Sequence, residues 1–138
     1  MDDVLLNKAA IIERCLRRIG EIYRGHEAEL ETDFLRQDAI VLNLQRACEA
    51  AIDAAMHLVR IKRLGLPQSR REAFTLLERA GILAPELAEA LRKMVGFRNI
   101  AVHAYQEIRS EVLRDILEHR LDDLRAFARL LVTMGSTS

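Results

Sequence analysis

The sequence predicts an all-α protein, folded as an antiparallel up-down bundle of four to five helices. Apolar residues recur every three or four positions along most of the chain, which is the period of an amphipathic helix. No segment shows the alternating pattern of a strand, and aromatic residues make up only 4% of the chain. A chain of 138 residues fits one helical domain, residues 1–138, in which we expect residues 135–138 to form a disordered tail.

The first two helices are the longest. The first is expected from about Asp3 to Tyr23, where Gly25 follows. The second is expected to begin at Thr32 or Asp33, which are good N-cap residues, and to reach about Leu64 before a Gly-Leu-Pro segment stops it. The apolar stripe of the first helix consists of Leu5, Ala9, Ile12, Leu16, Ile19 and Tyr23.

The second half of the chain predicts a short helix and two longer ones. Ser69 and Glu72 have the spacing of a capping box, which opens a short helix that ends at Gly81. Pro85 suits the first turn of the next helix, and the last helix begins near Ser110. Its buried stripe is expected to comprise Leu113, Leu117, Leu121, Leu124, Ala128 and Leu131.

The second helix carries more apolar residues than one stripe needs. A helix that is apolar around much of its circumference usually packs against more than one neighbour. We therefore expect the protein to form a homodimer through this helix. The residues concerned are Ile40, Val41, Leu42, Leu44, Ile52, Met56, Leu58, Val59 and Ile61.

Charge and cysteine content exclude some classes of protein. The formal net charge is zero, so bulk electrostatics do not attract the chain to nucleic acid or membrane. Cys15 and Cys48 lie on apolar helix faces without metal-ligand spacing, which predicts two reduced, buried thiols. The sequence contains neither a signal peptide nor an apolar run near 18 residues, so we expect a cytoplasmic protein without membrane contact.

One window of the sequence is basic and free of acids. It lies between Asp53 and Glu72, and it is either a solvated helix end and turn or an edge that contacts phosphate through Arg side chains. Both interpretations stay open from the sequence. The basic residues of the window are Arg60, Lys62, Arg63, Arg70 and Arg71.

The segment from Arg98 to Tyr105 holds the strongest candidates for chemistry. On an ideal helix, Arg98 and Tyr105 are seven residues apart and share one direction, while Asn99 and His103 share another, roughly 100 to 140° away. The four side chains therefore form a broad polar arc rather than one stripe. By spacing alone, this arc is either a site or the wet face of a helix.

Other polar residues give weaker signals. Glu49, Asp53 and His57 lie four apart on the second helix, where they are either a polar stripe or part of a metal site that lacks a fourth ligand. We expect the polar stripe and no metal. His26 and His119 have no converging partners in the sequence.

The segment RNIAVHAY fits the R-x-x-x-x-H-x-Y motif of the HEPN superfamily and resembles the HepT-like toxins in particular. The resemblance extends over most of the chain. It includes NLQRACEAAIDAAMHLV on the second helix and LPQSRREAFTLLERAGILAPELAEALRKMVGFRNIAVHAYQEI, which leads into and past the motif.

The resemblance implies a metal-independent ribonuclease, with no cofactor, that acts as the toxin of a toxin–antitoxin pair. In such a protein Arg98 and His103 are catalytic, while Asn99 and Tyr105 support RNA binding. Two copies of the motif face each other across a homodimer cleft. A nucleotidyltransferase antitoxin neutralises the toxin by attaching AMP to the motif tyrosine, which is Tyr105 here.

The side-chain chemistry agrees with these roles. Cleavage of RNA without metal needs a base for the ribose 2′-OH and an acid for the leaving oxygen, and histidine serves near neutral pH. The fork of Arg98 can hold the oxygens of the anionic transition state. Two other readings remain: a non-catalytic partner that binds nucleotide or substrate for a small nucleotidyltransferase, and a structural helical dimer without a ligand.

Overall fold

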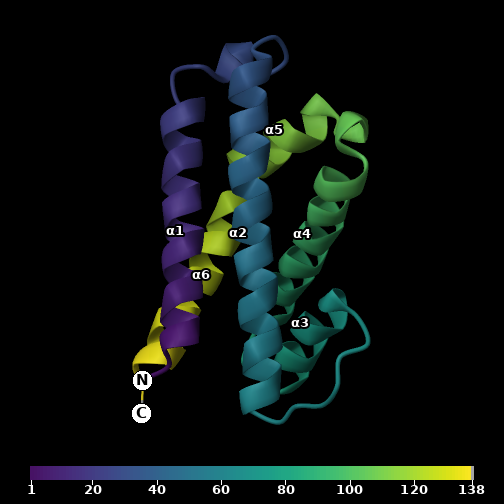
Figure 1. The fold of residues 1–138 in the computed structure, drawn as a ribbon. Helices are drawn as coiled ribbons and strands as arrows, with labels where there is room; N and C mark the ends of the chain where they lie inside the picture. The colour runs from purple at the N-terminus through teal and green to yellow at the C-terminus, as the bar shows by residue number, and fades with distance from the viewer. Residues whose placement is uncertain (138) are drawn as a thin grey trace.

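The computed structural model describes residues 1–137, which form six α-helices and two short 3-10 turns (Figure 1). No strand occurs in this range, which confirms the all-α prediction. The α-helices are α1 (Asp3–Tyr23), α2 (Phe34–Ile61), α3 (Arg70–Arg79), α4 (Pro85–His103), α5 (Ser110–His119) and α6 (Leu121–Ser136); the 3-10 turns are η1 (Glu27–Glu29) and η2 (Tyr105–Glu107).

Helix α2 lies at the centre of the arrangement. In Figure 1, α1 runs along one side of α2 and α4 along the other, while α6 packs behind α1 and α2. Helix α3 fills the space between the end of α2 and the beginning of α4. The two ends of the chain meet, because the backbone N–H of Asp2 donates to the carbonyl of Gly135 at 2.8 Å.

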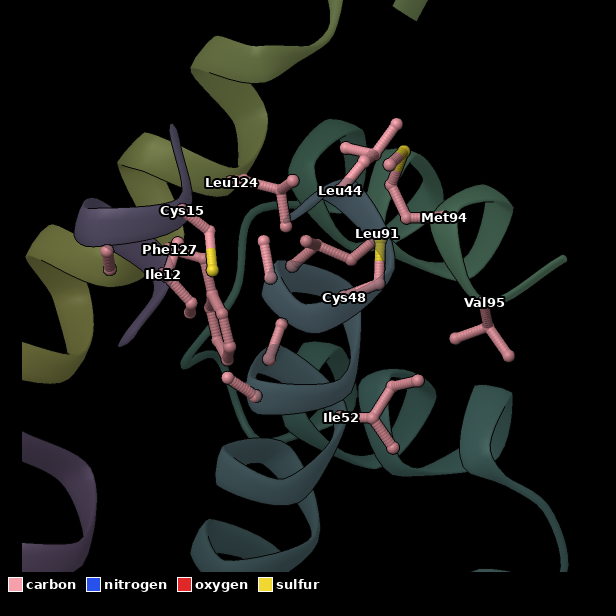
Figure 2. Packing of buried hydrophobic residues seen from close by; sticks show 14 of the residues in the cluster. Ile12, Cys15, Leu44, Cys48, Ile52, Leu91, Met94, Val95, Leu124 and Phe127 are labelled. Carbon is pink, nitrogen blue, oxygen red and sulfur yellow. The ribbon is translucent and has the colours of Figure 1, made fainter. Parts of the chain in front are cut away.

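One hydrophobic core joins these helices. Figure 2 shows Ile12 of α1, Leu44 of α2, Leu91 of α4 and Phe127 of α6 pointing into the same space. Burial of such side chains stabilises the fold by roughly 1.5–3 kcal/mol each. The core therefore fixes α2 against α4, the two helices that hold most of the candidate residues.

The two cysteines lie in this core as free thiols, as the sequence predicts. Burial raises the pKa of the Cys48 thiol to about 12, since the apolar surroundings disfavour the thiolate. Within residues 1–137, no helix is long and apolar enough to cross a membrane.

Most predicted helix starts are confirmed by their caps. The side chain of Asp33 accepts from the backbone N–H of Arg36 at 3.1 Å, and Ser69 Oγ accepts from the backbone N–H of Glu72 at the same distance. The Glu72 carboxylate accepts from the backbone N–H of Gln68, one residue before the cap, so the capping box is displaced by one position.

Two predicted helix ends are wrong. Helix α2 ends at Ile61 rather than Leu64, because Arg63 turns into the left-handed region with φ of 55°. The expected last helix is two helices, α5 and α6, which are separated at Arg120 with φ of −117° and ψ of −10°. The predicted apolar stripe still faces the core, with residues from both α5 and α6.

The expected tail is helical for part of its length. Helix α6 continues to Ser136, and Gly135 is buried against α1, where a Cβ would lie 3.0 Å from Leu6 Cδ2. Gly135 thus lets the end of α6 approach α1 closely. Ser138 lies outside the described residues.

The apolar surplus of α2 is smaller than the sequence suggests. Of the nine residues that suggested a second partner, six are buried inside the chain against the neighbouring helices, and Leu42, Met56 and Ile61 are exposed. Phe34 and Leu35, at the start of α2, are exposed as well.

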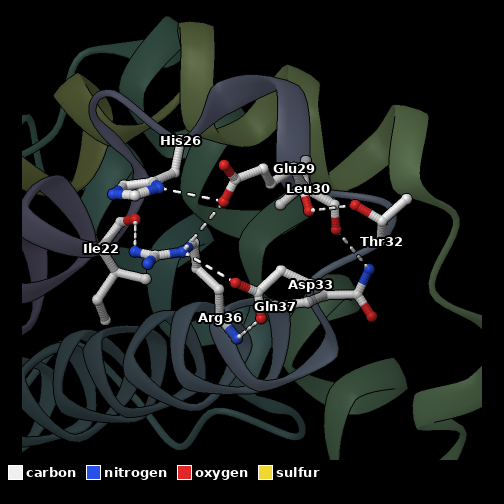
Figure 3. A network of polar contacts seen from close by, with 8 residues as sticks. All are labelled: Ile22, His26, Glu29, Leu30, Thr32, Asp33, Arg36 and Gln37. Carbon is white, nitrogen blue, oxygen red and sulfur yellow. Dashed lines mark hydrogen bonds and ion pairs between the residues drawn. The ribbon is translucent and has the colours of Figure 1, made fainter.

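A polar network fixes the turn between α1 and α2 (Figure 3). The guanidinium of Arg36 donates to the carbonyl of Ile22 at 2.6 Å and to the Asp33 carboxylate at 3.3 Å. His26 Nδ1 lies 3.1 Å from a carboxylate oxygen of Glu29. The expectation that His26 has no converging partner is therefore wrong, but the partner is local and belongs to the turn.

Candidate functional site

The C-terminal part of α4 and the η2 turn that follows it carry the candidate residues. Arg98, Asn99 and His103 belong to α4, whereas Tyr105 lies beyond it in η2. Ala104 leaves the helical region, with φ of −147° and ψ of 49°. The prediction that Arg98 and Tyr105 share one helical direction is therefore wrong, because the helix ends between them.

Arg98 is held in place by contacts on both sides. Its Nη2 donates to Glu49 Oε2 on α2 at 3.1 Å, and its Nη1 donates to Asn99 Oδ1 at 3.3 Å. The side chain is only 14% exposed, and its Nε is buried without a hydrogen-bond partner among the described residues. Glu49 also accepts from Gln45 at 3.3 Å, which orients the carboxylate. Charge-assisted bonds of this kind fix the orientation of the guanidinium fork.

Tyr105 is held against α2 by a different acid. Its phenol donates a hydrogen bond to Asp38 Oδ1, and the residue as a whole stays 37% exposed. Burial raises the pKa of Tyr105, and the Asp38 carboxylate raises it further, since a nearby negative charge disfavours the phenolate. The phenol is therefore neutral, anchored and still accessible from outside.

His103 is exposed on the last turn of α4. Its imidazole is open to a ligand that approaches the end of this helix. Within residues 1–137, a side-chain hydrogen bond joins Arg98 to Asn99, but none connects either side chain to the side chains of His103 or Tyr105. Arg98 and Asn99 are thus in direct contact. His103 lies at the end of the same helix, and Tyr105 lies beyond it in η2.

Sequence reasoning missed the two acids that position this site. Glu49 stood out only as part of a possible metal stripe, and nothing in the sequence pointed to Asp38. Both contacts join residues that are far apart in the chain, so local spacing carries no signal for them. Only the packing of α2 against α4 and η2 reveals these pairs.

The stripe of Glu49, Asp53 and His57 is polar, as expected, but each member has a separate partner. No group of three or more His, Cys, Asp or Glu side chains in the described part of the chain is arranged to hold a metal ion. The pairs are Glu49 with Arg98 at 3.1 Å, Asp53 with Lys8 at 3.2 Å and His57 with Asp2 at 2.9 Å.

All five basic residues of the acid-free window are exposed. Arg60 donates to His57 Nδ1 at 2.9 Å, and Arg71 donates to the carbonyl of Arg92 at 3.3 Å. The other three point into solvent without an ion pair among residues 1–137. Their exposure is compatible with a solvated turn and with a phosphate-contacting edge.

Comparison with known proteins identifies relatives that match most of the chain. The model of the family described as ribonuclease HepT-like matches residues 12–131. The mRNA nuclease HepT of Shewanella oneidensis is 46% identical over 127 residues, which cover 92% of this chain and 95% of that protein. The tRNA nuclease HepT of Aphanizomenon flos-aquae is 34% identical over 106 residues, or 71% of each chain.

Solved structures of similar sequence have the same fold as this chain. A toxin–antitoxin crystal structure with AMP-PNP superposes with a TM-score of 0.90 at 42% identity, covering 96% of this chain and 99% of the other. A tri-AMPylated HEPN toxin of Shewanella oneidensis, in complex with its MNT antitoxin, superposes with a TM-score of 0.90 at 43% identity and the same coverage.

Proposed function

Because the chain belongs to the ribonuclease HepT-like family, we propose that it is a metal-independent RNA-cleaving toxin in which Arg98 and His103 are catalytic. The observation that carries the proposal is a guanidinium fixed by Glu49 near the end of a helix whose last residue is an exposed histidine. This pair supplies a proton-transfer group and an anchor for a phosphate, and it needs no metal.

The proposed reaction is a transesterification at phosphorus. A neutral imidazole of His103 takes the proton of the ribose 2′-OH, and the 2′-oxygen forms a bond to phosphorus. The bond from phosphorus to the 5′-oxygen breaks, and an imidazolium gives that oxygen a proton. Arg98 stabilises the negative charge on the phosphoryl oxygens, while Asn99 holds the Arg98 fork from the side.

We propose that the active form is a homodimer. One chain offers one His103, whereas the reaction needs both a base and an acid, and a two-fold axis would bring a second histidine to the site. Exposed apolar side chains on the two helices that carry the site support such an interface. They are Leu42 and Met56 on α2 and Ile100 and Val102 on α4.

We propose that Tyr105 is the control point of the toxin. Relatives occur in complex with an antitoxin, and one of them is AMPylated. An exposed phenol close to His103 in sequence is a suitable acceptor for AMP from a nucleotidyltransferase antitoxin. The added phosphate would repel RNA and occupy Arg98. Residues 1–138 would act as one domain, in the cytoplasm, where RNA and ATP are available.

The test of this function is RNA cleavage by purified, unmodified protein in the presence of a chelator. The wild type and His119→Ala, which removes an exposed histidine at the end of α5, are expected to cut RNA. His103→Ala and Arg98→Ala are expected to lose at least a hundredfold in rate. Equal activity in all four proteins would exclude these catalytic roles.

The test of control uses mass spectrometry after co-expression with the antitoxin. We expect AMP on Tyr105 and loss of cleavage, with neither in Tyr105→Phe. An unmodified Tyr105 beside an active antitoxin would refute the control mechanism. A protein that binds the antitoxin but never cuts RNA in any modification state would instead be a non-catalytic partner.

A further inference from the structure

A charged groove of about 290 Å³ lies between α1 and α2, beside the candidate site. Arg14 and Arg18 of α1 line it from one side, and Arg46 of α2 lines it from the other. Glu49 also lines the groove, and the same carboxylate holds Arg98. The groove and the Arg98 site therefore share one side chain, Glu49.

The groove carries a net positive charge, because each of its two carboxylates is already paired with a basic side chain. Lys8 is paired with Asp53 at 3.2 Å, and Glu49 is paired with Arg98 at 3.1 Å. No carboxylate lies within ion-pair distance of Arg14, Arg18 or Arg46 among residues 1–137. Three guanidinium groups thus remain without a negative partner in one small groove.

The three arginines and the Cys15 thiol line the same groove. Burial raises the pKa of Cys15, at the floor of the groove, while the charges of Arg14, Arg18 and Arg46 each act on it in the opposite direction. Three like charges around one point repel each other, so an anion bound between them relieves that repulsion. The guanidinium fork matches two oxygens of a phosphate.

We propose that this groove binds backbone phosphates of the RNA next to the cleavage site and guides the strand to Arg98; the proposal rests on the proposed function. Arg14 and Arg18 are four residues apart on one helix, about 6 Å along its axis, so they can meet successive phosphates of one strand. Six of the nine residues that line the groove are charged, and the other three are Ile11, Cys15 and Ala50. This predominance of charged side chains favours a nucleic-acid strand over a protein segment that inserts an apolar anchor.

The test compares two triple variants that lose the same charge. R14A/R18A/R46A removes the groove arginines, while R17A/R24A/R129A removes three exposed arginines that line no part of the groove. Binding of single-stranded RNA is measured at several salt concentrations in the His103→Ala background, where the RNA stays intact. Cleavage is measured with His103 present.

We expect the groove variant to bind RNA at least tenfold more weakly. The slope of log K against log salt should fall by about 2, since each single-strand phosphate contact contributes about 0.7. In cleavage, KM should rise while kcat at saturating RNA changes less than about twofold. The control variant should match the wild type, and R14K/R18K/R46K should keep most of the salt slope because lysine retains the charge.

Three results would overturn the proposal. The first is an unchanged affinity and salt slope in the groove variant while the wild type cleaves RNA. The second is loss of antitoxin binding with RNA binding intact, which would assign the groove to a protein partner. The third is a groove variant that no longer dimerises in sedimentation experiments, because the loss of the dimer would then explain its weaker RNA binding. A wild type that neither binds nor cuts RNA would refute the proposed function itself.

Discussion

Arg98 shows at the scale of one residue how the fold prepares a flexible side chain for chemistry. A free arginine has many rotamers, and holding it in one of them before substrate arrives lowers the entropy lost in the transition state. Glu49 and Asn99 supply this restraint from two elements. We therefore regard Glu49 as a positioning residue.

Glu49→Gln should lower kcat for RNA cleavage about tenfold without raising KM. The amide keeps the shape of the side chain but removes the charge-assisted bond to Arg98, which is worth roughly 1.5–3 kcal/mol. Asp53→Asn is the matched control, because Asp53 lies one turn away and pairs with Lys8 instead. A rise in KM with unchanged kcat would show that Glu49 acts in binding and not in positioning.

The contact between Tyr105 and Asp38 predicts a change in titration. Asp38→Asn should lower the pKa of the Tyr105 phenol, because it removes a negative charge that opposes ionisation. The measurement is a pH titration of ¹³Cζ-labelled tyrosine by NMR, with Tyr105→Phe to assign the signal. A Tyr105 pKa that stays the same or rises in Asp38→Asn would rule out the contact.

The residues of the site differ in how well the sequence predicts them. Arg98, Asn99, His103 and Tyr105 lie within eight positions, so a linear motif can reveal them together. Asp38 cannot be found in this way, since it meets Tyr105 across 67 positions of sequence and only through packing. The motif therefore predicts the candidate side chains but not the contacts that orient them.

At the scale of secondary structure, two helix ends lie where the sequence does not place them: one at Ala104, before Tyr105, and one at Arg120. Neither Ala104 nor Arg120 is followed by glycine or proline, and the apolar pattern continues on both sides of Arg120. Local propensity therefore favours a continuous helix at both places. Tertiary contacts override it: Tyr105 is held by Asp38, and both α5 and α6 place their apolar faces on the common core.

Helix α4 also meets α3 at a glycine. A Cβ on Gly96 would lie 2.7 Å from Nη2 of Arg71, whose Nε donates to the carbonyl of Arg92. The guanidinium therefore crosses α4 where no side chain obstructs it. Because the obstructed atom is the end of a flexible exposed side chain, a substitution at Gly96 would displace Arg71 rather than the helix.

Gly96→Ala should change the free energy of unfolding very little, because a gain and a loss nearly cancel. Alanine favours the helix by about 1 kcal/mol, while displacement of Arg71 loses a hydrogen bond worth about 0.5–1 kcal/mol. In an Arg71→Ala background only the gain remains, so Gly96→Ala should raise the free energy of unfolding by about 1 kcal/mol. Urea denaturation of the four proteins completes the cycle. A loss of 1 kcal/mol or more in the Arg71→Ala background would mean that the helix needs glycine for another reason.

At the scale of the whole molecule, the helical period was sufficient to predict an all-α fold and the position of the core, although the structure has six α-helices in residues 1–137 instead of four to five. The predicted stripes of the first and last helices are buried almost throughout. The helical period could not predict how much of the apolar surface of α2 stays exposed for a partner. Six of the nine residues that suggested a partner are covered within the chain, by neighbours that the sequence does not identify as adjacent.

Because Cys48 is buried, the free energy of unfolding should depend on pH in the alkaline range. An unfolded chain ionises this thiol near pH 9, whereas the folded protein retains the proton until its pKa of about 12. The unfolded state therefore binds fewer protons in this window, and the free energy of unfolding falls as pH rises from 9 to 12. Cys48→Ala should show a shallower fall in urea denaturation between pH 8.5 and 10.5. Identical slopes would show that the thiol does not contribute.

The central claim is that Arg98 and His103 cleave RNA through the ribose 2′-OH without a metal. Mass spectrometry of the fragment ends, after cleavage in excess chelator, tests it most directly. We predict 2′,3′-cyclic phosphate and 5′-hydroxyl ends from the wild type and His119→Ala, and no fragments from His103→Ala. Cleavage that requires a divalent metal, ends that carry a 5′-phosphate, or equal cutting by His103→Ala would contradict the claim.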